Sequence, residues 1–360
     1  MSFLALASLV LVALQARASV MPIRAPAAAA KCQKYVDSAS KAAATLQSEY
    51  FKDGTYGDQA IWIGAVDAFY LNRLDDVAGT SDYKDVITTV FNGQEDYLTN
   101  GGSYDDVQWV SIAYLAYGDQ ENAKKYYDIA SSARDSQTCG GGLFWSSARD
   151  YKNSITNELY LALSGYMYDV TKDQQYLDNL KDLYAWFKDS RLLGDKGLYN
   201  DGLTKDGSCA NNGENPWTYN QGVVLVGLGY LYKNDNQDQA YIDAAYKLVD
   251  AVIDNLTIDG GLRENCETTS QNLCNADQTS FKGIFTYYLA WFLEITGKDN
   301  GTKYSDFIKA QADAVLKNAA QDGDKYTNLW YGADEGAAKH SSQSQGSALG
   351  ALLAASKQSC

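Results

Sequence analysis

A short polar turn recurs five times along the chain, each time between two stretches with helical character. Each turn contains Asp or Asn and is followed within a few residues by a Tyr. These tyrosines lie roughly 40 to 65 positions apart. They are Tyr83, Tyr126, Tyr176, Tyr241 and Tyr304. A period of this size indicates one supersecondary unit, here a pair of helices, repeated along the sequence.

The two helices of each pair differ in character. Residues 176–187 place apolar side chains at helical spacing with Lys and Asp between them, which is typical of an amphipathic surface helix. Residues 223–231 and 281–295 are apolar on almost every side. A helix of the second kind must be buried on every side. The sequence therefore predicts one layer of buried helices inside a layer of amphipathic ones.

We expect about twelve helices in an all-α (α/α)6 toroid formed by a single domain over residues 31–360. The inner helices are expected to begin near residues 58, 105, 153, 217, 278 and 343, and the outer ones near residues 32, 82, 119, 173, 236 and 300. Only 3 residues are Pro, which favours uninterrupted helices, and no strand-like alternation interrupts the pattern. The alternative is an irregular helical solenoid. Six pairs, and cysteines near both ends at Cys32 and Cys360, favour a closed ring.

The first residues resemble a secretion signal. A run of apolar and small residues over 3–14 precedes Ala16 and Ala18, which have the small-residue spacing of a cleavage site. The run is too short to span a bilayer comfortably. We predict a signal peptide at residues 1–18, a flexible leader at residues 19–30, and a secreted protein, with association with a cell wall as a further option.

Secretion gives the 6 cysteines a structural meaning, since disulfides persist in oxidising compartments. Six cysteines allow 15 pairings. The short loop between Cys266 and Cys274 makes that pair the favoured one. Two sequons, at Asn255 and Asn300, permit N-glycosylation.

The net charge of −15 argues against nucleic acid and anionic membrane surfaces as partners. A neutral sugar polymer or a small molecule fits better. Residues 341–360 lack the apolar tail that a lipid-anchor signal requires, so no membrane anchor is expected. We expect a monomer.

In a closed ring of this kind, every inner helix starts at the same end, and the side chains there are unusual for a core. They combine aromatic rings with amides and charged groups, the residue types that bind the C–H faces and hydroxyls of sugars. Each one alone has an ordinary structural explanation as a helix cap or core residue. They include Trp62, Trp109, Asn157, Trp217, Tyr219, Asn220, Gln221 and Lys282.

The adjacent pair Asp105–Asp106 is the candidate for chemistry. Glycoside hydrolysis uses two carboxyl groups, which in retaining enzymes stand roughly 5–5.5 Å apart. Two such close carboxylates do not both ionise readily, so one pKa should rise and leave a proton donor beside an ionised nucleophile. The competing explanation is a helix N-terminus that favours negative charge. His340 is the only histidine, which leaves little room for a catalytic triad or a multi-histidine metal site, and no cofactor is predicted.

Six ordered motifs resemble glycoside hydrolase family 76, the endo-α-1,6-mannanases, in its fungal branch. Together they extend over nearly the whole mature chain. They are the stretches at residues 104–109 (YDDVQW), 139–145 (CGGGLFW), 151–159 (YKNSITNEL), 217–222 (WTYNQG), 261–264 (GLRE), and 277–278 (DQ) with 281–283 (FKG).

This resemblance implies an (α/α)6 fold, no cofactor, and cleavage of α-1,6-linked mannan or a mannoprotein glycan with retention of configuration. It implies Asp105 as the nucleophile and Asp106 as the general acid/base. It also makes Trp62 and Trp145 candidate stacking faces. The residues Asn157, Tyr219, Asn220 and Gln221 become candidate contacts of sugar hydroxyls. Arg263 and Lys282 either contact substrate or form ion pairs that hold the loops. The family often has two consecutive Trp after the Asp pair, where this chain has Trp109–Val110.

Three other functions remain open from the sequence. Some fungal members of the family resemble transglycosylases that act on the mannose core of lipid-anchor glycans. A non-catalytic mannan-binding wall protein is a second alternative. The third is an inverting enzyme, in which Glu158 or Glu264 would be the more distant carboxyl group, roughly 6.5–9.5 Å away. The sequence leaves open endo or exo action, branch tolerance, disulfide pairing, oligomeric state and glycosylation of Asn255 and Asn300.

Overall fold

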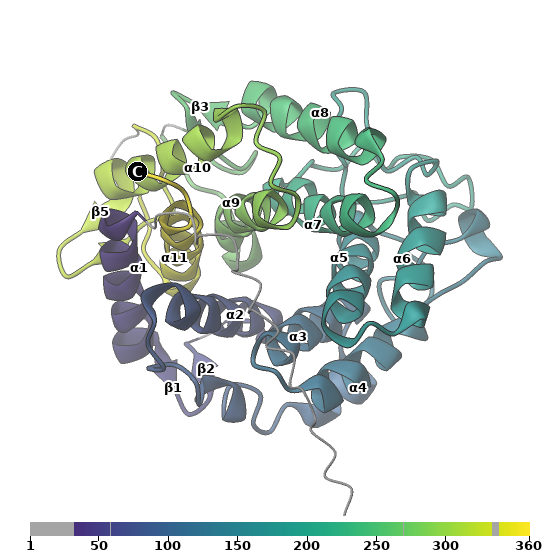
Figure 1. The fold of residues 1–360 in the computed structure, drawn as a ribbon, viewed down its shortest axis with the longest axis horizontal. Helices are drawn as coiled ribbons and strands as arrows, with labels where there is room; N and C mark the ends of the chain where they lie inside the picture. Colours follow the sequence, from purple (N-terminus) through teal and green to yellow (C-terminus); the bar gives the residue numbers. More distant parts are fainter. Residues whose placement is uncertain (1–31, 58, 269, 333–337) are drawn as a thin grey trace, which may run out of the picture.

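The computed structural model describes residues 32–57, 59–268, 270–332 and 338–360. These residues form two concentric layers of helices closed into a ring, as Figure 1 shows. The fold is the predicted (α/α)6 toroid. The signal peptide predicted at residues 1–18 and the leader predicted at residues 19–30 lie outside the described residues.

The inner layer contains the apolar helices that the sequence predicts. All 15 residues of the last one, α11, are buried, which explains why it has no polar face. None of the described helices combines the length and apolarity needed to cross a membrane. The inner helices are α2 (Ile61–Ala78), α3 (Tyr104–Ala116), α5 (Ser154–Thr171), α7 (Thr218–Asn234), α9 (Ala276–Thr296) and α11 (Ser342–Ser356).

The outer helices are amphipathic. In α6, the buried side chains are apolar residues at helical spacing, and the remaining positions face outward. Among the described residues, the outer helices are α1 (Gln33–Thr45), α4 (Gln120–Ser131), α6 (Gln174–Phe187), α8 (Gln239–Asn255) and α10 (Lys303–Ala314).

The outer helix expected near residue 82 does not form. The chain there makes turns, a short 3-10 helix η2 (Val86–Thr88) and one π-helical turn η3 (Tyr97–Gly101). Residues 86–90 are five consecutive β-branched residues, which lose side-chain freedom in a helix, and Gly93 adopts a positive φ of 76°. The low helix propensity of these residues therefore prevents the outer α-helix that the repeat predicts at this position.

The two ends of the ring differ in their connections. The five recurring polar turns link each inner helix to the following outer segment at one end. Three of their aspartates, Asp119, Asp173 and Asp238, cap α4, α6 and α8 by accepting a backbone N–H hydrogen bond. Longer connections return to the inner helices at the opposite end.

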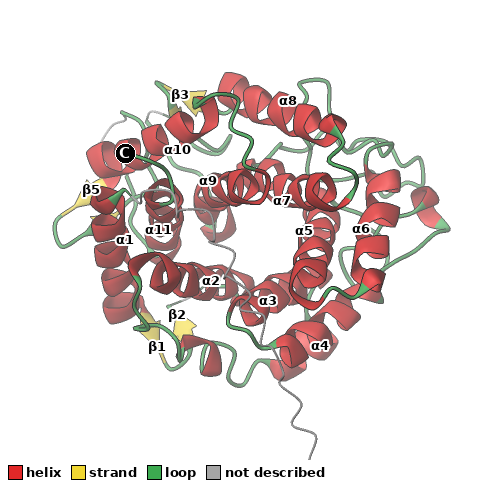
Figure 2. Ribbon diagram, in the orientation of Figure 1, coloured by secondary structure: helices red, strands yellow, loops and turns green. Residues whose placement is uncertain are grey.

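In the described part of the chain, three hairpins with strands of two residues each lie within the longer connections (Figure 2). The sequence predicts no strand there. The hairpins are β1 (Phe51–Lys52) with β2 (Thr55–Tyr56), β3 (Thr257–Ile258) with β4 (Gly261–Leu262), and β5 (Ala320–Gln321) with β6 (Lys325–Tyr326).

Three disulfides join all six cysteines. Cys266–Cys274 is the predicted short-loop pair and is confirmed. Cys32–Cys360 joins the residue before the outer helix α1 to the chain end after the inner helix α11, where the ring closes. Cys139–Cys209 ties together the connections that precede α5 and α7. Covalent links between such distant segments restrict the unfolded chain and so favour the closed ring.

The glycine run at residues 140–142 lies flat against an outer helix. The indole Nε1 of Trp186 in α6 donates a hydrogen bond of 2.8 Å to the carbonyl of Cys139. A Cβ atom on Gly142 would lie 2.4 Å from the Trp186 ring, whereas one on Gly140 would have no neighbour within 4 Å. The glycines thus allow close packing of this loop, which leads to Trp145.

We predict that Gly142→Ala destabilises the protein by about 1–3 kcal/mol more than Gly140→Ala, because only the first substitution overpacks the Trp186 contact. Both positions have positive φ, so the strain of an L-residue in that region is present in both variants. Thermal unfolding of the two variants measures the difference. Equal melting temperatures would show that the loop is not packed against Trp186.

Candidate active site

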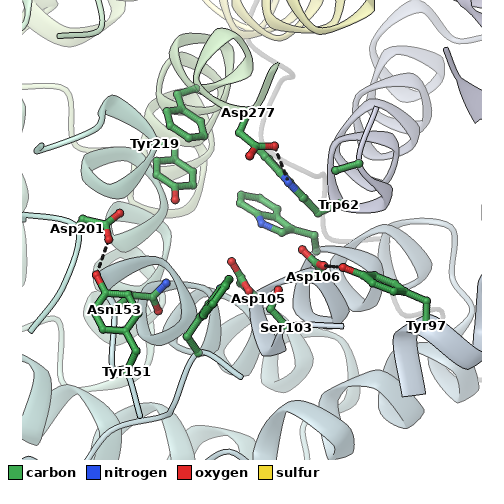
Figure 3. Close-up of a pocket in the computed structure, with 14 residues that line it drawn as sticks. Trp62, Tyr97, Ser103, Asp105, Asp106, Tyr151, Asn153, Asp201, Tyr219 and Asp277 are labelled. Carbon is green, nitrogen blue, oxygen red and sulfur yellow. Dashed lines mark hydrogen bonds between the residues drawn. The ribbon is translucent and has the colours of Figure 1, made fainter. Parts of the chain in front are cut away.

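One cavity of about 460 Å³ opens where five of the six inner helices begin. It is the end of the ring at which the sequence predicts the unusual side chains. Figure 3 shows carboxyl, phenol, amide and indole groups converging on it from separate helices and loops. Its lining consists of Ala60, Trp62, Tyr97, Ser103, Asp105, Asp106, Trp109, Trp145, Tyr151, Asn153, Asp201, Tyr219, Asp277 and Phe281.

The two consecutive aspartates occupy the first turn of α3. Ser103 begins the helix in an extended conformation, and Asp105 and Asp106 follow Tyr104. Figure 3 shows both carboxyl groups directed into the space between Trp62, Tyr219 and Asp201. The Asp106 Oδ2 atom accepts a hydrogen bond of 2.8 Å from the hydroxyl of Tyr97. The Oδ1 atom of Asp105 is enclosed and has no hydrogen-bond partner among the described residues.

Burial raises the pKa of both carboxyl groups of the pair above the usual value of an aspartate. The negative charge of Asp106 raises the pKa of Asp105 further. The Tyr97 hydrogen bond opposes the rise for Asp106, because it stabilises the ionised form. Two acidic groups this close interact strongly, so they titrate as a pair and not independently.

Two more carboxyl groups face the pair across the cavity. Asp201 accepts a hydrogen bond from the Tyr151 hydroxyl, and Asp277 accepts one of 3.2 Å from the indole Nε1 of Trp62 (Figure 3). Burial raises the pKa of each, and the hydrogen bond partly offsets the rise. Each of these groups keeps lone pairs with which it can accept hydrogen bonds from sugar hydroxyls.

Aromatic rings form much of the remaining wall. Trp62 and Trp109 stack with ring centroids 5.7 Å apart, and Tyr219 stacks on Phe281 at 3.8 Å. Trp145 stands at the rim with 39% of its surface exposed. Exposed or cavity-facing ring surfaces of this kind suit the C–H faces of a pyranose. Of the predicted substrate contacts, Trp62, Trp109, Trp145 and Tyr219 thus meet at the cavity with Asp105 and Asp106.

Two of the predicted amide contacts bind the protein itself. Asn157 is fully buried and exchanges hydrogen bonds with the backbone of Leu143, so it holds the glycine-containing loop. Gln221 exchanges hydrogen bonds with the backbone of Tyr199 and also donates to the Trp217 carbonyl. Neither lines the cavity, because both amides are used to fasten loops to the inner helices. We correct both assignments from substrate contact to loop support.

Four other predicted residues also lie outside this lining. Asn220 is fully buried and neither amide atom has a partner among the described residues. Trp217 packs edge-on against Phe281 and faces a neighbouring hollow. Lys282 is fully buried and forms a 2.7 Å ion pair with Glu267. This is the second of the two predicted roles, in which Lys282 holds a loop. Arg263 faces a separate cavity.

The distant carboxyl groups considered for an inverting mechanism do not reach the cavity. Glu264 is buried and accepts hydrogen bonds from the backbone N–H and hydroxyl of Thr218, at the start of α7. Glu158 is also fully buried, and burial raises its pKa well above the usual value of a glutamate. Neither is among the lining residues.

Sequence reasoning missed three lining residues with clear roles. Tyr97 lies in the segment that was expected to be a helix, and Asp201 lies in a connection without a recognised motif. Ser103, which begins α3, was also not selected. Tyr151 belongs to a quoted motif but was not selected as a contact, whereas Asn153 and Asp277 lie at the starts of inner helices, where the sequence predicts sugar-binding side chains. Across the described ranges, no group of three or more His, Cys, Asp or Glu side chains is arranged to hold a metal ion.

The sequence model of glycosyl hydrolase family 76 matches residues 99–359. The chain belongs to glycosyl hydrolase family 76. A fungal relative, the mannan endo-1,6-alpha-mannosidase DCW1 of Candida glabrata, is 28% identical over 201 residues, which cover 54% of this chain and 44% of the relative. The chain thus spans less than half the length of the first curated relatives it matches, and these are fungal proteins.

Solved structures of the family share the fold. The GH76A alpha-1,6-mannanase of Salegentibacter sp. HEL1_6 superposes with a TM-score of 0.78 at 21% identity, covering 89% of this chain and 98% of that chain. A second solved structure is of an inactive variant of that mannanase, in which two consecutive aspartates are replaced by asparagine, in complex with alpha-1,6-mannotriose. It has a TM-score of 0.79 at 20% identity and covers 89% and 99% of the two chains.

We predict that Tyr97→Phe raises the pKa of Asp106 by roughly one unit, because the lost hydrogen bond stabilises only the ionised carboxylate. An NMR titration of ¹³C-labelled aspartate carboxyl groups measures the change. Tyr151→Phe is the matched control, since it removes a phenol hydrogen bond from Asp201 instead. The control should raise the pKa of Asp201 and leave the pair unchanged. An unaltered Asp106 in Tyr97→Phe would show that this hydrogen bond does not form in solution.

Proposed function

We propose that this protein is a secreted, retaining, endo-acting α-1,6-mannanase that cleaves its substrate with Asp105 and Asp106. The observation that carries the proposal is the pair itself: two adjacent carboxyl groups, whose pKa values burial raises, lie in a cavity walled by indole rings. Membership of family 76 supports the reaction class. The names of the fungal relatives, and the mannotriose complex of the Salegentibacter variant, support α-1,6-linked mannan as the substrate.

In the first step, Asp105 attacks the anomeric carbon while Asp106 donates its proton to the leaving oxygen. A covalent glycosyl-enzyme forms, and the shortened chain leaves with the proton. In the second step, Asp106 removes a proton from water, which attacks the same carbon and releases Asp105. Two inversions give net retention.

In the reacting complex, the proton of the pair must lie on Asp106 and the negative charge on Asp105. Positive charge develops at the anomeric carbon as the bond breaks, and this charge stabilises an ionised Asp105 beside it. The leaving oxygen becomes more basic at the same time and favours a protonated Asp106. The bound substrate thus favours ionised Asp105 and protonated Asp106 over the opposite arrangement.

The rest of the cavity suits a sugar bound at that position. Asp201, Asp277 and Asn153 offer hydrogen-bonding groups to hydroxyls, and Trp62 and Trp145 offer ring faces. Three disulfides support an extracellular location, as does the signal-like sequence at the N-terminus.

We predict that Asp105→Asn and Asp106→Asn each lower kcat/KM on linear α-1,6-mannan by at least about a thousandfold, because each removes one of two carboxyl groups that act as a unit. Asp254→Asn is the control, since Asp254 is exposed on an outer helix. NMR of the fresh products should show α-anomeric oligomannosides from the wild type and from the control.

Other products would point to the alternatives. A β-anomer would contradict retention and indicate a distant second carboxyl group. Longer chains in place of shorter ones would indicate a transglycosylase. Binding of mannan by the wild type and all three variants without any cleavage would indicate a non-catalytic binding protein.

We also predict a bell-shaped dependence of kcat/KM on pH. Activity requires one proton on the pair, so it is lost at low pH when both groups are protonated and at high pH when both are ionised. Since burial raises both pKa values, both limbs should lie above the value of about 4 of an ordinary aspartate. Tyr97→Phe should move the acid limb to higher pH, because it removes a hydrogen bond that stabilises an ionised carboxylate of the pair. An acid limb near pH 4 would contradict the raised pKa values.

A further inference from the structure

A second cavity, of about 670 Å³, lies outside the catalytic one and shares no lining residue with it. It is formed by the connection between α6 and α7, the end of α8 and the segment after β4. Its residues are Ser190, Arg191, Leu193, Gly194, Asp195, Lys196, Leu198, Asn200, Asn211, Gly213, Glu214, Asn215, Pro216, Asn255, Leu256, Arg263 and Asn265.

This cavity collects the arginines that lack an ion pair. The described part of the chain contains five arginines, of which Arg73, Arg134 and Arg149 form ion pairs with aspartates. The other two, Arg191 and Arg263, both line this cavity.

Arg263 lies in a segment held by a backbone hydrogen bond, and its side chain has an unused hydrogen-bond donor. It is half-buried, and its Nε atom is enclosed without a hydrogen-bond partner among the described residues. The backbone N–H of Arg263 donates a hydrogen bond of 3.0 Å to the carbonyl of Leu256 and fixes the segment. An enclosed guanidinium without a partner costs stability unless a ligand completes it.

The lining also contains a lysine and two acids. Lys196 has no ion-pair partner in the described ranges either. Asp195 and Glu214 are exposed, and neither lies within 4.0 Å of the three cations. The cations therefore keep their charge available to the cavity. Guanidinium groups present forked donors that match phosphate oxygens, which makes phosphate a better ligand than a single carboxylate oxygen.

A third hollow, of about 470 Å³, shares lining residues with both cavities. It shares Tyr151 and Asp201 with the catalytic cavity and shares Glu214 with the cationic cavity. Trp217 lies in its wall, where an oligosaccharide passing through could stack. A glycan that extends from Asp105 and Asp106 through this hollow would reach the two arginines.

We propose that the second cavity binds a phosphate group carried by the glycan whose mannoside lies at Asp105 and Asp106. The group is a phosphate monoester or diester on the oligosaccharide, and Arg191 and Arg263 are its main contacts. This inference rests on the proposed mannanase function and narrows its substrate to phosphate-bearing mannan. The neutral part of the chain occupies the catalytic cavity and the third hollow.

The test compares a phosphate-bearing α-1,6-mannan with an enzymatically dephosphorylated portion of the same preparation. The protein is deglycosylated first, because Asn255 of one sequon lines the cavity. The wild type should show a kcat/KM about tenfold higher on the phosphorylated sample at low salt, since hydrogen bonds to charged groups are worth about this factor or more. Arg191→Gln and Arg263→Gln should each lower that ratio toward one.

Lys247→Gln is the control, because it removes the same charge from an exposed site on α8 outside the cavity. It should keep the wild-type ratio. Thermal unfolding of each variant identifies any loss of folding, and Arg191, which is exposed, provides a substitution that does not disturb the interior.

The outcomes separate the two proposals. Cleavage of both samples at equal rates by the wild type overturns the phosphate site and leaves the mannanase intact. Failure to cleave either sample overturns the mannanase itself. Competition by inorganic phosphate that depends on Arg263, without any preference for the phosphorylated mannan, assigns the cavity to the free ion and overturns the glycan-borne ligand.

Discussion

The inner helices are apolar on almost every side, and such a helix is stable only with protein on every side. The outer helices cover them from outside, and their neighbours in the ring cover the flanks. Because inner and outer segments alternate along the chain, the inner helices all run in the same direction. Five of them therefore begin around one cavity. The location of the site is a consequence of this burial requirement.

Burial at that cavity also sets the chemistry of its acids. Asp105, Asp106 and Asp277 lie in the first turns of α3 and α9, where the helix dipole favours negative charge by about 0.3–1 kcal/mol. Their pKa values nevertheless rise, so loss of hydration outweighs the dipole. Titration of the two carboxyl groups as a pair follows from placing them next to each other in a poorly hydrated wall.

The walls depend on how the long connections are held. Lys152 is buried and donates hydrogen bonds to the carbonyls of Thr138 and Gly141, and Asn157 holds Leu143 of the same loop. The disulfide Cys139–Cys209 joins this loop to the connection that carries Asp201. Lys152 and Asn157 do not line the cavity themselves, yet they hold the segments that carry Trp145, Tyr151 and Asn153. A sequence motif that predicts binding thus contains two kinds of residue. Some face the cavity, and the others hold the cavity-facing residues in position.

The sequence by itself determined the ring, its two layers, the end that carries the site and the pair Asp105–Asp106, because burial periodicity and adjacent carboxyl groups are local properties of the chain. It also indicated the Cys266–Cys274 pair through its short loop. Only the tertiary structure decided that Tyr97, from the segment that lacks the expected outer α-helix, reaches Asp106. It likewise decided that Trp62 and Tyr219 line the cavity whereas Asn157 and Gln221 do not. It also placed Arg191 and Arg263 in the lining of one second cavity. Those outcomes depend on which segments meet across the fold, and hydrogen bonds between residues far apart in sequence leave no periodic signal in it.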